Sequence, residues 1–364
     1  MVNGILSVEV SGVVGKARNI AFDICKGIAI YAVVMIHLET VLSWRIPTET
    51  VAMPTFFFIS GYFFSKYFLQ SDGGEIDQFF KKCKRLLLPF LVWSSVAFVF
   101  NLALEVMVKG TTSDFSEIIR FQAFDIFVHA RSLWFLICLF FTFSFTLLCH
   151  YFGRIIKPHR KYTGAALAVI GYVLLYMFVF DSVESSVFRF FKFQWLYPYF
   201  LLGCVIKREL VESCLEFACR HRIMLLLTAL CVLSLMYTLY NERMYSLWCE
   251  PNIMESRGGV WILALYYLLG TAGVFLLLGL SGIISKSTNV GLFLSDVGQY
   301  SLDVYVMHMF FVKALFILMP QGFAASGLYA YGVAPLLGAA IVVVTYLLAK
   351  KVFSKISAYR YLMR

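Results

Sequence analysis

The apolar residues of this chain are gathered into long runs, separated by short polar segments. A stretch of about 20 mostly apolar residues crosses a bilayer as a helix, so these runs decide the fold class. They predict ten spans, at residues 20–39, 52–69, 86–105, 132–151, 163–180, 193–206, 223–240, 260–281, 299–319 and 333–350. The chain has 61% hydrophobic and 14% charged residues, whereas soluble domains carry about 25% charged residues. We therefore expect an all-α, polytopic integral membrane bundle of about ten transmembrane helices.

The basic residues favour one orientation of this bundle. With the N-terminus placed inside, the inner segments hold 20 Lys and Arg residues and the outer segments hold eight. Cytoplasmic loops carry such an excess, so both termini should be cytoplasmic. The expected parts are a cytoplasmic tail at 1–17, a ten-span membrane domain at 18–350, and a basic cytoplasmic tail at 351–364. The net charge of +10 lies in short blocks between spans, which fits membrane lipids as partners and no nucleic acid.

Several other chemistries lack their motifs. Of nine cysteines, only Cys249 falls in a predicted outer loop, so no disulfide framework is expected. No His-x-x-x-His or Cys-x-x-Cys pattern is present, and we expect no metal site and no bound cofactor. Phosphate-binding Gly-x-x-x-x-Gly-Lys and nucleophilic Gly-x-Ser-x-Gly sequences are also missing.

The first span, DICKGIAIYAVVMIH, carries three ionisable residues. Lys26 and His37 are eleven residues apart and differ by only about 20° around a helix, and Asp23 lies within about 40° of the same stripe. A charged group at bilayer depth costs about 2.5–3.5 kcal/mol unless it faces protein or water. The stripe should therefore point into the bundle. The alternative is an internal ion pair and a hydrogen-bonded histidine that only fix helix packing.

The same stretch resembles the first-span motif of the membrane acyltransferase-3 family, in which a basic residue precedes a histidine by about ten positions and an Asp lies nearby. Four later stretches resemble the family in the same order: PTFFFISGYFFSKYF (54–68), KKCKRLLLPFLVW (81–93), RSLWFLICL (131–139) and SLDVYVMHMFF (301–311). The departure is Lys26, where many members have arginine. Lysine keeps the positive charge but cannot make the two parallel hydrogen bonds of a guanidinium group.

This resemblance implies an integral-membrane O-acyltransferase of the bacterial cytoplasmic membrane. Such an enzyme would move an acyl group, most plausibly acetyl, from cytosolic acyl-CoA to a hydroxyl of a cell-envelope polysaccharide or lipid-linked sugar. The donor acyl-CoA, in this case acetyl-CoA, and the glycan acceptor are then the expected partners. The oligomeric state is left open.

The chemistry of acyl transfer suggests roles for the first span. An imidazole near neutral pH suits removal of a hydroxyl proton, so His37 is the expected catalytic base. Lys26, with Asp23 holding it, is expected to position the donor, because it lies about 16 Å away along the helix axis. A covalent acyl-histidine relay is an alternative to direct transfer.

A second group of residues is expected to bind substrate. Ser301, Tyr305 and His308 share one face of the ninth predicted span, where an interhelical hydrogen bond is the structural alternative for the histidine. Asp303 is a possible partner of Lys26. The remaining candidates are Arg131, Trp134 and Arg85.

Two of these have common structural explanations. Trp134 is at an expected membrane border, where tryptophan is usually an anchor. Arg85 ends the basic block Lys81, Lys82, Lys84, Arg85, for which we favour a role in topology and attraction to anionic lipid over phosphate binding.

Two other classes of function stay open at this stage. A secondary transporter or flippase would use Asp23, Lys26 and Asp303 to relay ions or bind substrate. A non-catalytic membrane scaffold is the third reading. Radiolabelled acetyl-CoA distinguishes a transporter from an enzyme. An enzyme would acylate an acceptor, whereas a transporter would only move solute across sealed vesicles.

Overall fold

A computed structural model describes residues 20–38, 49–70, 74–109, 115–131, 133–156, 162–178, 187, 191–239, 259–320 and 322–363. All regular structure in these ranges is helical, as expected from the apolar runs. The predicted tail at 1–17 and Cys249 lie outside these ranges.

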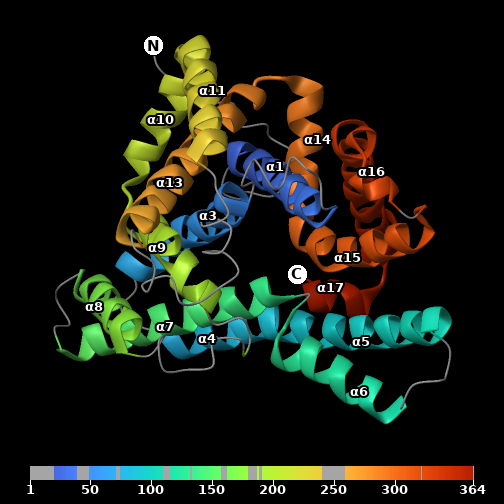
Figure 1. The fold of residues 1–364 in the computed structure, drawn as a ribbon. Helices are drawn as coiled ribbons and strands as arrows, with labels where there is room; N and C mark the ends of the chain where they lie inside the picture. The colour runs from blue at the N-terminus through green and yellow to red at the C-terminus, as the bar shows by residue number, and fades with distance from the viewer. Residues whose placement is uncertain are drawn as a thin grey trace.

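Figure 1 shows the helices coloured in chain order, from blue at the N-terminal side to red at the C-terminal side. The α-helices are α1 (Ile20–His37), α3 (Glu49–Gln70), α4 (Glu75–Lys82), α5 (Leu88–Lys109), α6 (Phe115–Ala123), α7 (Trp134–Ile156), α8 (Thr163–Phe178), α9 (Phe191–Val205), α10 (Arg208–Arg220), α11 (Arg222–Leu239), α13 (Gly259–Ile284), α14 (Thr288–Gln299), α15 (Ser301–Leu318), α16 (Ala334–Leu347) and α17 (Ser357–Met363). The π-helical turns are η1 (Cys83–Leu87), η2 (Phe124–Val128), η6 (Tyr329–Val333) and η7 (Leu348–Val352), and the 3₁₀ turns are η5 (Phe323–Ala325) and η8 (Phe353–Lys355).

A helix lies at each of the ten predicted spans, but fewer are long and apolar enough to cross a bilayer unaided. Within the described residues six pass that test: Ile20–His37, Glu75–Met107, Trp134–Ile156, Ala264–Ile284, Ser301–Leu318 and Tyr329–Lys355. A seventh is possible if α10 and α11, which meet at 103°, form one broken span. The protein is a multi-pass helical membrane protein, and the count of about ten stays a prediction.

The short sixth predicted span corresponds to α9. This helix begins at Phe191, slightly earlier than residue 193, and contains Pro198 in its interior. Neighbouring helices can compensate for the missing proline N–H inside a membrane protein.

Helix α1 is the centre of the packing. It contacts α3, α13, α14, α15 and α16, and eleven of its 18 residues are buried. In Figure 1 the α10, α11 and α13 group and the α14 to α16 group flank α1, while α4, α5 and α7 lie across the lower side. Most of α1 is therefore enclosed by other helices.

Glycines allow the closest helix crossings. A Cβ atom on Gly298 of α14 would lie 1.8 Å from the carbonyl oxygen of Asp23, and one on Gly27 would lie 2.3 Å from that of Leu294. Small residues let membrane helices approach in this way. The crossing holds the C-terminal end of α14 against the charged turn of α1.

The C-terminal segment folds back onto the bundle. Helix α17 contacts α5 and η1, the Tyr359 hydroxyl donates to Asp303 of α15, and the Lys84 ammonium lies 3.7 Å from the centre of the Tyr361 ring. These contacts attach the predicted tail at 351–364 to the helices that surround the site described next.

Candidate active site

A cavity of about 940 Å³ opens between α1, α3, the α4–η1 helix, α7 and the α14–α15 junction. Its walls are mainly apolar and aromatic, and polar side chains gather toward one end. The lining residues are Asp23, Lys26, Ile30, Met53, Phe56, Ile59, Ser60, Phe63, Phe64, Gln78, Lys82, Arg85, Leu86, Phe135, Leu139, Phe143, Gln299, Ser301, Leu302 and Tyr305.

The polar end of the cavity is positively charged. The Lys26 ammonium lies 2.7 Å from the Asp23 carboxylate one helical turn away, and both side chains line the cavity. Lys82 and Arg85 line it from the α4–η1 helix. The Lys82 ammonium lies 3.7 Å from the centre of the Phe143 ring, over its face, where a cation is attracted by the ring quadrupole. Three cations thus accompany one carboxylate.

The other end of the lining carries Tyr305. Its hydroxyl oxygen accepts a hydrogen bond of 3.2 Å from the backbone N–H of Phe135, at the start of α7. Ile30 and Met53 line this part of the cavity as well. The cavity therefore runs along α1 from the charged turn to Ile30 and reaches the second turn of α15.

Two histidines lie beyond this lining. The ring centres of His37 and His308 are 5.1 Å apart. His308 has no exposed surface and follows Tyr305 by one turn of α15. His37 follows Ile30 by two turns, about 10 Å along α1. The structure therefore places the base candidate on the expected stripe, but past the cavity wall.

The other candidate residues fall into two groups. Arg85, Ser301 and Tyr305 line the cavity with Asp23 and Lys26, whereas Asp303 is hydrogen-bonded to Tyr359.

Arg131 and Trp134 lie apart from the cavity lining. Arg131 pairs with Asp125 at 3.5 Å and has a 62% exposed side chain. Trp134 packs edge to face with Phe135 at 6.3 Å. The Lys192 ammonium lies 5.7 Å from the centre of the Trp134 ring.

Sequence reasoning missed Gln78 and Gln299 as cavity residues, and it named Lys82 only within the basic block, where phosphate binding was the less favoured role. A signal exists for two of them. Gln78, Lys82 and Arg85 are spaced four and three apart, which is one helix face, and the structure turns that face toward α1. Lys192 was also missed, and it is a lysine buried at 5% exposure.

The α4 helix is fixed to α7 by a buried carboxylate. Glu75 contacts His150 Nδ1 at 3.0 Å and Arg154 Nη2 at 3.2 Å, and its side chain is only 8% exposed. Because Gln78 and Lys82 follow Glu75 on α4, this contact sets their position in the cavity.

Replacing Glu75 with alanine should destabilise the protein by a few kcal/mol. Removing one partner of a buried ion pair leaves the others unsatisfied and costs about 3–5 kcal/mol in a fully buried site, and here Arg154 is partly exposed. The measurement is the thermal unfolding of detergent-purified protein. Asp77→Ala is the matched control, because Asp77 lies on the same helix and is exposed. Equal melting temperatures for the two variants would refute this role of Glu75.

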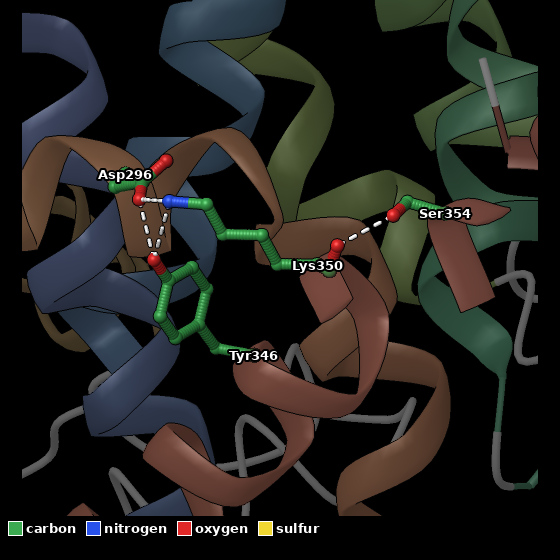
Figure 2. Close-up of polar contacts among 4 residues, drawn as sticks. All are labelled: Asp296, Tyr346, Lys350 and Ser354. Carbon is green, nitrogen blue, oxygen red and sulfur yellow. Dashed lines mark hydrogen bonds and ion pairs between the residues drawn. The ribbon is translucent and has the colours of Figure 1, made fainter. Parts of the chain in front are cut away.

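A second polar cluster fastens the α14–α16 side of the site (Figure 2). The Asp296 carboxylate on α14 accepts hydrogen bonds from the Tyr346 hydroxyl and the Lys350 ammonium. Lys350 also donates to the Tyr346 hydroxyl at 2.9 Å. Asp296 precedes Gln299 by one turn, so the cluster restrains the helix end that closes the charged part of the cavity.

Within the described residues no group of three or more His, Cys, Asp or Glu side chains is arranged to hold a metal ion.

These features define a class: a multi-pass helical membrane protein with a cationic cavity and, beyond its lining, two adjacent imidazoles. A family model described as an acyltransferase domain, Acyl_transf_3, matches residues 19–350. The match covers most of the chain, and the protein belongs to the acyltransferase-3 family. It is a membrane acyltransferase.

No curated protein and no solved structure matches the chain.

Proposed function

We propose that this protein is an O-acyltransferase of the bacterial cytoplasmic membrane. It takes an acyl group, which we assign as acetyl, from cytosolic acyl-CoA and transfers it to a hydroxyl of a cell-envelope polysaccharide or lipid-linked sugar. The observation that carries the proposal is the cavity, which is lined by three cations and by Tyr305, one turn of α15 before His308. The acyl identity and the glycan acceptor rest on what the family resemblance implies.

The charged end of the cavity suits the phosphates of a donor. Lys26, Lys82 and Arg85 line the same space, and cationic donors make the strongest hydrogen bonds to phosphate oxygens. The volume of about 940 Å³ lies at the upper end of the range of ordinary ligand pockets. The apolar walls between Lys82 and Tyr305 then accommodate the flexible arm that carries the thioester.

The reaction is assigned to the far end of that arm. His37 removes the proton from the acceptor hydroxyl, and the hydroxyl oxygen bonds to the thioester carbonyl carbon. The Tyr305 hydroxyl is the donor we assign to the carbonyl oxygen as it becomes anionic. The carbon–sulfur bond then breaks, and the departing CoA thiolate takes the proton held by His37. The products are the sugar ester and CoA.

The direct test uses inside-out membrane vesicles from cells that make the protein, supplied with [1-14C]acetyl-CoA. Label should appear in the glycan or lipid-linked sugar fraction as an alkali-labile ester. Vesicles from cells without the gene are the control. Uptake of an intact labelled solute with no ester formed would instead support a transporter and reject the proposal.

Lys82→Gln should raise the KM for acetyl-CoA about tenfold or more and change kcat much less. A hydrogen bond to a charged group contributes about 1.5–3 kcal/mol, and tenfold in affinity corresponds to about 1.4 kcal/mol. The matched control is Lys81→Gln, because Lys81 is adjacent, exposed and not part of the cavity lining. Initial rates at varied acetyl-CoA measure both constants. Equal KM values for the two variants would show that Lys82 does not contact the donor.

A further inference from the structure

We propose that His308 is a positioning residue for His37, whose ring it holds by accepting a hydrogen bond at Nε2. This inference rests on the proposed function, because it assigns the partner of the catalytic base.

The hydrogen bond to Tyr305 decides the tautomer of His308. Its Nδ1 lies 2.6 Å from the backbone carbonyl oxygen of Tyr305. A carbonyl oxygen can only accept, so Nδ1 must carry the proton. In a neutral imidazole one nitrogen is a donor and the other an acceptor. The Nε2 atom of His308 therefore presents a lone pair.

That lone pair needs a donor. His308 has no exposed surface, and its Nε2 atom is buried with no hydrogen-bond partner among the described residues. An unsatisfied buried acceptor is costly, and water has no direct access to it.

His37 is placed to supply the donor. Two imidazoles joined nitrogen to nitrogen at about 2.9 Å have ring centres about 5 Å apart, and the observed separation is 5.1 Å with 41° between the ring planes. A rotation of the His37 ring about its side-chain bonds suffices to direct an N–H at His308 Nε2.

The consequence for His37 is a fixed tautomer. With one ring nitrogen donating to His308, the other must carry the lone pair that removes the acceptor proton. When His37 takes that proton, its N–H toward His308 becomes a charged donor, and such hydrogen bonds are stronger than neutral ones. His308 thus favours the protonated form of His37 that arises during transfer.

The test compares two substitutions that differ only in reach. The amide of His308→Gln extends to the position of Nε2 and presents an acceptor there, whereas the amide of His308→Asn reaches only the position of Nδ1. We expect the Gln variant to keep most of kcat and the Asn variant to lose about 10- to 100-fold. The KM for acetyl-CoA should stay unchanged in both. The assay is the [1-14C]acetyl transfer described above.

A second measurement does not depend on activity. The chain has six histidines, so histidine-selective 15N labelling gives few signals. The Nε2 resonance of His308 should have the shift of an unprotonated, hydrogen-bonded nitrogen and should move on His37→Ala.

The outcomes are separable. Equal kcat for the Gln and Asn variants would overturn the pairing while the wild type still transfers acetyl. So would a His308 Nε2 shift that is unchanged in His37→Ala. A rise in the KM of the acceptor sugar would also overturn it, because His308 would then bind substrate itself. A wild type that transfers nothing would reject the proposed function as a whole.

Discussion

His37→Ala is expected to lower acyl transfer by about 10²–10⁴-fold, the usual contribution of a positioned general base. The protein should stay in the membrane at wild-type amounts, because His37 is at the end of α1 and the packing of that helix depends on its other residues. Transfer of label from [1-14C]acetyl-CoA measures the loss, and immunoblotting of the membrane fraction measures the amount.

The matched control is His221→Ala. His221 is exposed at the joint between α10 and α11. It is far along the chain from both His37 and His308, and its loss should leave transfer unchanged. Retained activity in His37→Ala would reject the catalytic role. Labelling without acceptor distinguishes direct transfer from a covalent relay. Labelled acetyl that stays on the wild-type protein, but not on the His37→Ala variant, would indicate an acyl-histidine intermediate.

Gly298→Ala is expected to disturb both the fold and the charged end of the cavity. The added Cβ would lie 1.8 Å from the backbone oxygen of Asp23. Two non-bonded atoms cannot come so close, so α14 and α1 must separate. Overpacking of this kind typically costs about 1–3 kcal/mol and occasionally more. Because Asp23 pairs with Lys26 and Gln299 follows Gly298, the charged end of the cavity should widen together with the loss of stability.

Thermal unfolding in detergent and the KM for acetyl-CoA measure the two consequences. Gly327→Ala is the control, since no heavy atom lies within 4 Å of the Cβ position there. If the Gly298 variant melts and binds donor like the Gly327 variant, the close crossing of α1 and α14 does not hold the site together.

Much of the helical fold could be predicted from the sequence because apolar runs of bilayer length leave few alternatives. The positions where helices bend or join could not be predicted. The 103° bend between α10 and α11 occurs at His221, where the chain has neither proline nor glycine. The join of α4, η1 and α5 into one helical stretch also runs through the basic block, which precedes the predicted span at 86–105.

The site was partly predictable for a related reason. The cost of charge in lipid predicts that Asp23 and Lys26 face inward, and they form an ion pair that lines the cavity. Their roles in transfer stay predictions. The approach of His308 to His37 depends on how α15 crosses α1, and no local pattern encodes that crossing.

Lys82 shows where sequence reasoning reaches its limit. For a basic block beside a span, the sequence favours topology and anionic lipid over donor binding. Only the packing of α4 on α7 through Glu75 turns this lysine toward the cavity. Asp303 shows the same limit. Its hydrogen bond to Tyr359 joins α15 to the C-terminal helix α17, and no local pattern predicts that contact.

The most direct measurement supplies [1-14C]acetyl-CoA to one face of sealed vesicles at a time. Inside-out vesicles, which expose the face where Lys26, Lys82 and Arg85 should open to the cytosol, are expected to form labelled sugar ester, and right-side-out vesicles are not. Ester formed only from the opposite face, or label that crosses the membrane with no ester in either case, would contradict a cytosolic donor cavity that leads to His37.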